Sequence, residues 1–243
     1  MWVIAGAATV EQQHGQSREP GAGDARPSLL ALAAVAKAWG PRQVLAGIDL
    51  RLEPGTLTWI GGHNGSGKTT LLRIAAGLIA PDAGAVELEG LHPRRDRREF
   101  HRRLGFLSAG DRGIYGRLTA MEHLELWARL ALMPRREVAP AVEETVERLG
   151  IGELLPHRAD RLSMGQRQRV RLAMAFLHAP DVVLLDEPLT SLDGAGVDSL
   201  NACLAHLLAR GGAAVWCSPG VEHGQPAFDA RLWLSDGRLR VAE

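Results

Sequence analysis

The most informative segment of this 243-residue chain is Gly62-His63-Asn64-Gly65-Ser66-Gly67-Lys68-Thr69. A short apolar run, Leu57–Ile60, precedes it, and Lys68–Leu78 follows with apolar residues at helical spacing. Glycines let backbone N–H groups turn inward around phosphate oxygens, and a helix presents its positive N-terminus to the same anion. A strand, a glycine-rich loop and a helix in this order therefore predict a nucleotide-phosphate site.

Two side chains of this loop are expected to do chemistry. Lys68 supplies a positive charge to the β- and γ-phosphates, and the Thr69 hydroxyl can ligate Mg²⁺. The other predicted nucleotide contacts in the loop and the first helical turn are Gly62, His63, Asn64, Gly65, Ser66, Gly67 and Thr70.

A second apolar run, Val182–Leu185, predicts a buried strand that ends in two carboxylates. Asp186 is placed to hold Mg²⁺ through water, and Glu187 to polarise an attacking water molecule as a catalytic residue. Alone, this pattern also fits a strand that runs into a turn. Its presence together with the glycine-rich loop favours the catalytic interpretation.

A third segment, Leu162–Arg169, places a serine and a glycine before a helix that continues through Leu177. Ser163, Gly165 and Gln166 are predicted to bind an anion through a capping hydroxyl, a close backbone approach and a helix N-terminus. An ordinary helix cap explains the same residues.

Strands and helices alternate at both ends of the chain, with a helical segment between them. Apolar runs predict strands at 29–35, 44–52, 85–88, 182–185 and 213–216, and a hairpin at 232–241. A capping box at Thr119 and Glu122 begins a helix to Met133, a second helix covers 137–149, and a third covers 195–209. We expect an α/β domain over 28–243 with a helical insert at about 110–178, after a flexible extension over 1–27.

Composition narrows the class of protein. Hydrophobic residues make up 46% of the chain and the formal net charge is +0, so no overall charge attracts nucleic acid, and we expect no nucleic-acid partner. The cysteines, Cys203 and Cys217, lie far apart, which is typical of buried free thiols in a reducing compartment. Apolar runs fall short of the roughly 20 residues that span a bilayer.

Together these motifs resemble the ABC ATPase family. Leu162–Arg169 is similar to its signature motif, with Met164 in place of the first glycine, and Ser191-Leu192-Asp193 resembles its D-loop. Trp39 lies where the family places an aromatic residue that stacks on adenine, although a tryptophan in a turn would look the same. The resemblance runs from Leu29 to about Val241.

The resemblance implies a fold and a function. The fold is a P-loop NTPase core, with a mixed sheet flanked by helices, an antiparallel β subdomain and a helical subdomain insert. The function is ATP- and Mg²⁺-dependent hydrolysis that powers transport through separate multi-span permease subunits, on the cytoplasmic face of the plasma membrane. A second ATP-binding domain, in a homo- or heterodimer, closes each site. Similarity to exporter-type bacterial ATPases favours export.

Two residues depart from the family pattern. Ala109 occupies the position of a usual glutamine, and Pro219 that of a usual histidine, with His223 a few residues further on. Loss of a positioning or proton-transfer group costs roughly 10²–10⁴-fold in rate. We therefore expect slow but real hydrolysis. The alternative is a low-turnover, ATP-binding regulatory partner in a mixed pair.

An arginine-dense segment follows the predicted strand at 85–88. It contains Arg94, Arg95, Arg97, Arg98, Arg102 and Arg103, with Asp96 and Glu99 interspersed. A membrane-facing patch would need such cations, but mixed charges are more typical of a solvated helix face, which is our prediction.

Overall fold

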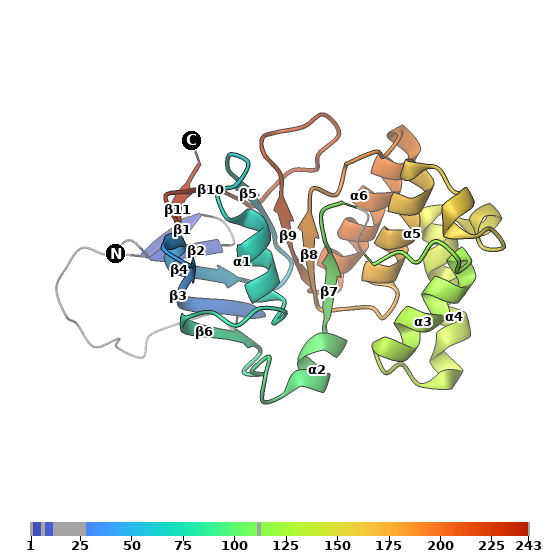
Figure 1. Ribbon diagram of the computed structural model, residues 1–243, viewed down its shortest axis with the longest axis horizontal. Coiled ribbons are helices and arrows are strands. Elements are labelled where there is room, and N and C mark those ends of the chain that lie inside the picture. The colour runs from blue at the N-terminus through green and yellow to red at the C-terminus, as the bar shows by residue number, and fades with distance from the viewer. Residues whose placement is uncertain (1, 6–7, 12–27, 111–112, 243) are drawn as a thin grey trace.

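The computed structural model describes residues 2–5, 8–11, 28–110 and 113–242. The chain folds into two sheets and a group of helices (Figure 1). This arrangement confirms the predicted α/β class, with a mixed sheet flanked by helices and a separate antiparallel sheet.

The first sheet is antiparallel and has the strand order β1-β2-β4-β3-β6. Its strands are β1 (Trp2–Ala5), β2 (Ala8–Glu11), β3 (Leu30–Trp39), β4 (Arg42–Leu52) and β6 (Ala83–Leu88). The turn at residues 40–41 joins β3 to β4. The sequence did not predict β1 and β2, which fall inside the expected flexible extension. Residues 12–27 of that extension lie outside the described residues.

The second sheet is mixed and has the order β11-β10-β5-β9-β8-β7. It contains β5 (Leu57–Gly61), β7 (Leu104–Leu107), β8 (Val182–Asp186), β9 (Ala213–Cys217), β10 (Ala230–Ser235) and β11 (Arg238–Val241). All neighbours pair in parallel except the β10–β11 hairpin. Strands β5, β8 and β9 are buried along their whole length, and their sequences are apolar apart from Thr58 and Asp186.

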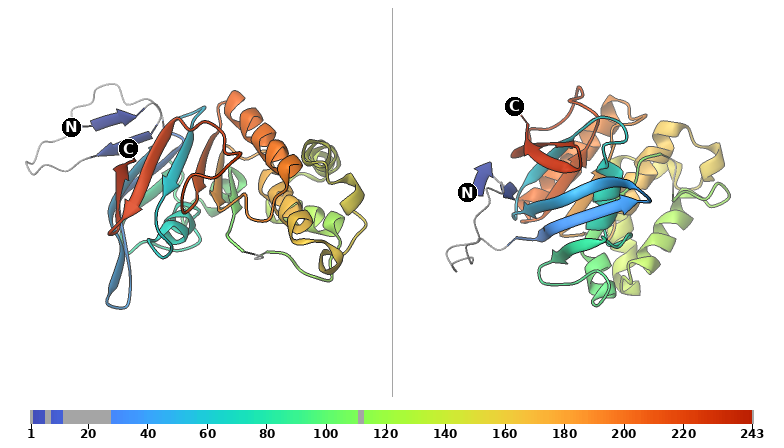
Figure 2. Two further views of the ribbon diagram at one scale, coloured as in Figure 1. Left: turned by 90° about the horizontal axis from the view of Figure 1, so that it is seen from above. Right: turned by 60° about the vertical axis from the view of Figure 1, so that its left-hand side comes forward.

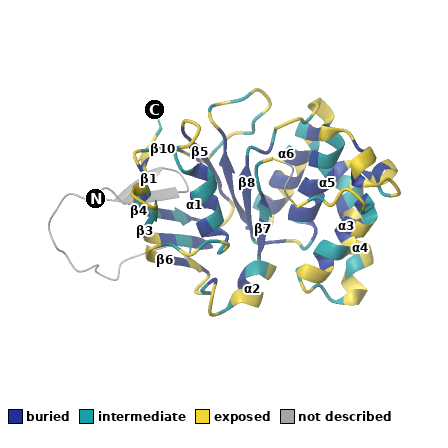
Figure 3. Ribbon diagram, in the orientation of Figure 1, coloured by how far each residue is buried: buried dark blue, intermediate teal, exposed yellow. Residues whose placement is uncertain are grey.

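The helices pack on both faces of this mixed sheet. They are α1 (Lys68–Ala75), α2 (Arg97–Arg102), α3 (Ala120–Leu130), α4 (Arg135–Leu149), α5 (Met164–Phe176) and α6 (Gly194–Ala209). Figure 2 shows α5 and α6 on one side of the strands and the antiparallel sheet on the other. The buried positions follow the central strands, and the outer helices carry the exposed ones (Figure 3).

Alternate residues of one strand face two different apolar clusters. Val182 and Leu184 of β8 join the cluster that contains α1 and the antiparallel sheet. Val183 and Leu185 join the cluster that contains α3, α4, α5 and α6. Since side chains alternate along a strand, α1 and α5 lie on opposite faces of the mixed sheet.

Several element boundaries differ from prediction. The helix predicted over Lys68–Leu78 ends at Ala75, because Gly77 takes a left-handed conformation with φ +67°. The helix predicted to reach Met133 ends at Leu130, before Leu132 at φ +58°. Its capping box is confirmed, since Thr119 Oγ1 accepts from the Glu122 N–H and the Glu122 carboxylate accepts from the Thr119 N–H. Helices α3, α4 and α5 fall inside the predicted insert, whose limits stay a prediction.

The arginine-dense segment includes the short helix α2, of which only Phe100 is buried. Arg94, Arg95, Arg97, Arg98 and Arg102 are exposed, as a solvated helix face requires. Both cysteines are buried and free. Burial raises the pKa of the Cys203 thiol to about 11 and that of Cys217 well above its usual value. Among the described residues, no helix is long and apolar enough to cross a membrane.

Candidate functional site

The glycine-rich loop connects the buried end of β5 to the first turn of α1. A Cβ atom on Gly62, which has φ +155°, would lie 2.7 Å from both the Leu234 carbonyl oxygen and Ser66 Oγ. A Cβ on Gly67, at φ +111°, would lie 2.8 Å from a methyl group of Val44. The loop therefore follows a path that L side chains would block at both positions.

Lys68 lies inside this loop and is only 5% exposed. Its Nζ donates hydrogen bonds to the carbonyl oxygens of Gly62, at 2.5 Å, and His63, at 3.2 Å. Within the described part of the chain, the buried Ser66 Oγ has no hydrogen-bond partner. A buried ammonium group and an unsatisfied hydroxyl fit an anionic ligand, so the loop can hold the phosphates of ATP.

Thr69 of α1 contacts Asp186 of β8. Thr69 Oγ1 donates to Asp186 Oδ2 at 2.8 Å, which joins the first turn of α1 to the end of β8. Asp186 is 1% exposed, and this burial raises its pKa, while hydrogen bonds from Thr69 and the Ala109 N–H and the charges of Lys68 and Arg73 lower it. A buried carboxylate beside a hydroxyl is a donor set that suits Mg²⁺.

Glu187 follows Asp186 and leaves the strand with an unusual backbone. Its φ is +51°, a left-handed conformation that costs roughly 1–3 kcal/mol for a residue other than glycine. The Glu187 N–H donates to the Cys217 carbonyl oxygen at 2.8 Å, and the Glu187 carbonyl accepts from the Thr190 N–H. These bonds hold the turn that places Glu187 next to the predicted metal ligand.

The predicted second anion site forms the start of α5. Ser163 caps the helix: its Oγ accepts from the Gln166 N–H, and the Gln166 side chain accepts from the Ser163 N–H at 2.8 Å. A Cβ on Gly165 would lie 2.6 Å from the Ser191 carbonyl oxygen, so this glycine allows close contact with the loop after β8. The helix-cap interpretation is therefore correct for Ser163 and Gln166, and their nucleotide contact stays a prediction.

The structure does not bring these three segments into one cluster. The loop before α1, Thr69, Asp186 and Glu187 are neighbours at one edge of the mixed sheet. Ser163 and Gly165 belong to α5, which packs on the opposite face of the sheet from α1 (Figure 1).

Trp39 ends β3 close to the glycine-rich loop. Its side chain is 51% exposed, and Lys37 Nζ lies 4.9 Å from the centre of its ring. Arg42, three residues further on, donates from Nη2 to the Gly65 carbonyl oxygen at 3.0 Å. Sequence reasoning missed Arg42, although its place just after the Trp39 turn was a signal for it.

The family comparison agrees with this geometry. The sequence model described as "ABC transporter" matches residues 45–190, more than half of the chain, from β4 to the loop after Glu187. The chain belongs to the ABC transporter family.

ABC proteins of several organisms resemble the chain over most of its length. It is 32% identical over 192 residues to the ABC transporter ATP-binding protein NatA of Bacillus subtilis, covering 79% of this chain and 78% of that protein. It is 38% identical over 195 residues to the cytochrome c biogenesis ATP-binding export protein CcmA of Bordetella bronchiseptica, covering 80% and 84%. With the lipoprotein-releasing system ATP-binding protein LolD of Bacteroides fragilis, identity is 32% over 216 residues, covering 87% and 100%.

Solved structures of ABC subunits share the fold. An ATP-binding subunit of an ABC transporter superposes with a TM-score of 0.81 at 22% identity, covering 88% of this chain and 90% of that one. CbiO1 from Clostridium perfringens, part of the ABC transporter complex cbiONQ, gives 0.73 at 22% identity, covering 88% of each chain.

The two positions that depart from the ABC pattern have other contacts here. Ala109 places its backbone N–H, and no side-chain amide, against Asp186. Before Pro219, the buried Ser218 Oγ accepts from Trp59 Nε1 at 2.8 Å and donates to the Gly220 carbonyl oxygen at 2.7 Å.

The loop after Pro219 adds a carboxylate that sequence reasoning missed. His223, the predicted substitute for the family's histidine, is exposed. The pKa of Glu222 is raised, first by burial and then by the negative charge of Glu187. Glu222 thus lies near enough to Glu187 to feel its negative charge.

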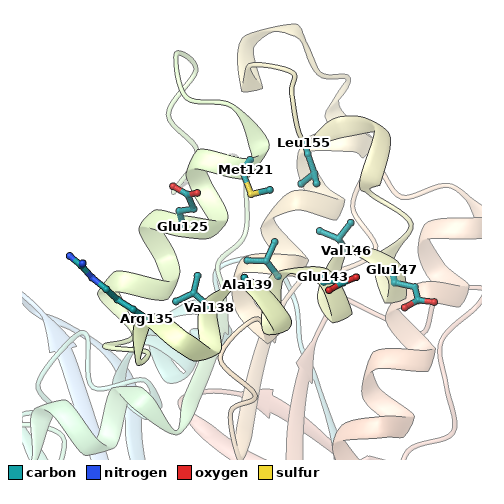
Figure 4. A pocket seen from close by; sticks show the side chains of 10 residues that line it. Met121, Glu125, Arg135, Val138, Ala139, Glu143, Val146, Glu147 and Leu155 are labelled. Atoms are coloured by element: carbon teal, nitrogen blue, oxygen red, sulfur yellow. The ribbon is translucent and has the colours of Figure 1, made fainter.

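An open groove of about 790 Å³ lies between α3 and α4 of this ABC domain (Figure 4). Apolar side chains from both helices and the following segment line it, among them Met121, Val138, Val146 and Leu155. Three carboxylates and one guanidinium group lie at its edges: Glu125, Glu143, Glu147 and Arg135.

Proposed function

We propose that the chain hydrolyses ATP and powers export through separate membrane-spanning subunits. The observation that carries the proposal is the hydrogen bond between Thr69 and Asp186, which joins the phosphate loop to the strand that ends in Glu187. The names of two relatives, an ATP-binding export protein and the ATP-binding protein of a lipoprotein-releasing system, support export as the direction of transport. In this role the protein works at the cytoplasmic face of the plasma membrane.

Each residue of the site has a separate role in this proposal. Lys68 and the loop amides bind the phosphates, and Trp39 stacks on the adenine. Thr69 and Asp186 hold Mg²⁺, which when bound neutralises the developing phosphate charge. Glu187 orients the attacking water and accepts its proton.

Two ATP-binding domains are needed for a closed site. Because α1 and α5 lie on opposite faces of one sheet, Ser163 of the chain cannot close over the phosphates bound before its own α1. A second domain supplies Ser163 and Gly165 across the interface, as the N-terminus of α5 favours an anion.

ATP turnover by the purified protein with its membrane subunits tests the proposal. We expect the wild type to release phosphate slowly, and Glu187→Gln to release it roughly 10²–10⁴-fold more slowly while it still binds ATP. Turnover no higher than that of Glu187→Gln would contradict the assignment as an enzyme.

A low-turnover regulatory partner in a mixed pair is the second candidate function. Ala109 and the Ser218–Pro219 turn favour it, because neither offers a side-chain amide or imidazole to the phosphates. ATP-driven dimerisation without turnover above the Glu187→Gln level would support this candidate over the first.

We further propose that the groove between α3 and α4 receives a basic, amphipathic cytoplasmic segment of the membrane-spanning subunit. Apolar lining and an excess of carboxylates at Glu125, Glu143 and Glu147 complement such a segment. Charge reversal by Glu143→Lys with Glu147→Lys should reduce co-purification with the membrane-spanning subunit.

The matched control for the groove is Glu137→Lys with Glu144→Lys, which changes carboxylates of α4 that line a different hollow, between α4 and α6. The control pair should co-purify like the wild type, and both pairs should bind ATP normally. Equal loss in both pairs would assign the effect to net charge and reject the docking site.

A further inference from the structure

A buried polar network connects α5 with the residues that flank the predicted magnesium site. Its starting point is the segment after β7, where Ala109 replaces the family's glutamine. The methyl group of Ala109 cannot ligate a metal, but the Ala109 N–H faces the Asp186 carboxylate and helps to lower its pKa. The position of this amide therefore affects how Asp186 is held.

Arg171 of α5 fixes the residue before this amide. The guanidinium group is buried, with the whole side chain 5% exposed. Arg171 Nη2 donates to the Ser108 carbonyl oxygen and also lies 3.3 Å from Ser108 Oγ. Since Ser108 and Ala109 share one peptide unit, the bond to the Ser108 carbonyl orients the Ala109 N–H that faces Asp186.

Gln168, one turn earlier on α5, extends the network to the segment that follows β8. Arg171 Nη1 donates to Gln168 Oε1 at 2.6 Å, and Gln168 Nε2 donates to the Pro188 carbonyl oxygen at 2.9 Å. Pro188 directly follows Glu187, whose backbone is in the left-handed conformation. Residues three apart share one helix face, so a single turn of α5 reaches the ends of both β7 and β8.

We propose that Arg171 and Gln168 are positioning residues that hold the Ala109 amide against Asp186 and the peptide after Glu187 in place. A planar guanidinium group suits this role, because its fixed fork binds two oxygens and its charge is retained on burial. The pair lies on the helix that Ser163 caps. The same helix therefore contacts the residues that flank this chain's predicted metal site and carries the predicted contact for the second domain's nucleotide. The proposal rests on the proposed function of Asp186 as a metal ligand.

Arg171→Met removes the guanidinium group, and Arg171→Lys keeps the positive charge but lacks the planar guanidinium geometry. We expect Arg171→Met to weaken Mn²⁺ binding to the ATP complex, measured by electron paramagnetic resonance, by about 10–100-fold, as the loss of an outer-shell partner does. The affinity for ATP without metal, measured with a fluorescent analogue, should change less than about twofold. Where turnover is measurable, kcat should fall by a similar factor as Mn²⁺ affinity, and KM should change little.

Two further variants, Gln168→Leu and Arg148→Met, are compared with the Arg171 variants. Gln168→Leu should lower kcat and leave Mn²⁺ affinity nearer the wild-type value, because its bond goes to Pro188. Arg148→Met is the control, because Arg148 lies on α4 and pairs with Glu144 of that helix. Arg171→Lys should recover part of the Mn²⁺ affinity, and it keeps the test open if Arg171→Met does not fold.

Two results would overturn the proposal. One is Mn²⁺ affinity within about threefold of wild type in both Arg171 variants. The other is an equal loss of metal-free ATP binding in Arg171→Met and Arg171→Lys, which would show a general structural role. Because Mn²⁺ binding is measured without turnover, a wild type that binds metal and does not hydrolyse ATP would reject the proposed function and leave this inference standing.

Discussion

His178, just after α5, shows how burial acts on a single titratable side chain. Burial lowers the pKa of its imidazole from the usual 6.5, and the positive charge of Arg210 acts in the same direction. The contact of Nε2 with the Leu104 carbonyl oxygen and the charge of Asp181 oppose the shift. The folded protein therefore keeps His178 neutral at pH values where the unfolded chain binds a proton.

We predict a loss of stability on mild acidification that depends on this histidine. As pH falls through 6.5, the unfolded state takes up the proton first, so the free energy of unfolding decreases. In thermal melts between about pH 7.5 and pH 5.5, the Tm of the wild type should fall more than that of His178→Gln. Parallel pH profiles of the two proteins would contradict the prediction.

Helix α5 packs closely against β7 near the site. A Cβ atom on Gly105 of β7 would lie 2.2 Å from the carbonyl oxygen of Ala175. The glycine thus sets how closely α5, and with it Arg171, approaches the end of β7.

Gly105→Ala should destabilise the domain by about 1–3 kcal/mol, because backbone has to move apart to admit the methyl group. Differential scanning calorimetry would register this as a Tm decrease of roughly 2–10 °C for a domain of this size. Gly194→Ala is the control, since a Cβ there meets no atom within 4 Å. A Tm decrease of the same size in both variants would reject the steric explanation.

Short sequence patterns predicted those secondary-structure elements whose form depends on a few neighbouring residues. The glycine-rich loop, the capping box at Thr119 and the buried strand before Asp186 are each determined within a few neighbouring residues. Helix α2 was predicted only as a solvated helix face, without bounds, because its single buried residue, Phe100, gives no periodic apolar pattern. Two helix ends were missed because Gly77 and Leu132, just beyond them, adopt left-handed conformations.

The sequence predicted which residues form the candidate site, but it predicted fewer of the contacts between them. The sequence pointed to both Thr69 and Asp186, and the structure joins them at 2.8 Å. Arg42, Arg171 and Glu222 were not predicted, because each meets its partners through contacts between residues far apart in the chain. Without the fold, an arginine on a helix is indistinguishable from a solvated one.

At the scale of the whole molecule, the mixed sheet separates the N-terminal ends of α1 and α5, the two predicted anion-binding helix starts. Helices α1 and α5 pack against different apolar clusters on its two faces. In the proposed function, a single chain therefore presents one phosphate loop and one signature helix to two different nucleotides.

ATP-driven dimerisation separates the binding role of Ser163 from its capping role. Ser163 and Thr119 are both N-caps with complete capping boxes, so Ser163→Ala and Thr119→Ala should each cost about 0.5–2 kcal/mol of stability. In a Glu187→Gln background with ATP, light scattering after size exclusion should show a dimer for Thr119→Ala and a monomer for Ser163→Ala. Dimers in both variants would exclude Ser163 from the interface.

Because both thiols are buried, the native chain should react very little with cysteine-directed reagents. Maleimides and iodoacetamides react with thiolates, and at neutral pH a thiol with a pKa of about 11 or higher is almost entirely protonated as well as shielded. One cysteine introduced at an exposed position would then carry a dye or spin label alone, with Cys203 and Cys217 left in place. Distances between two labelled copies could be followed through an ATP cycle in an otherwise unaltered protein.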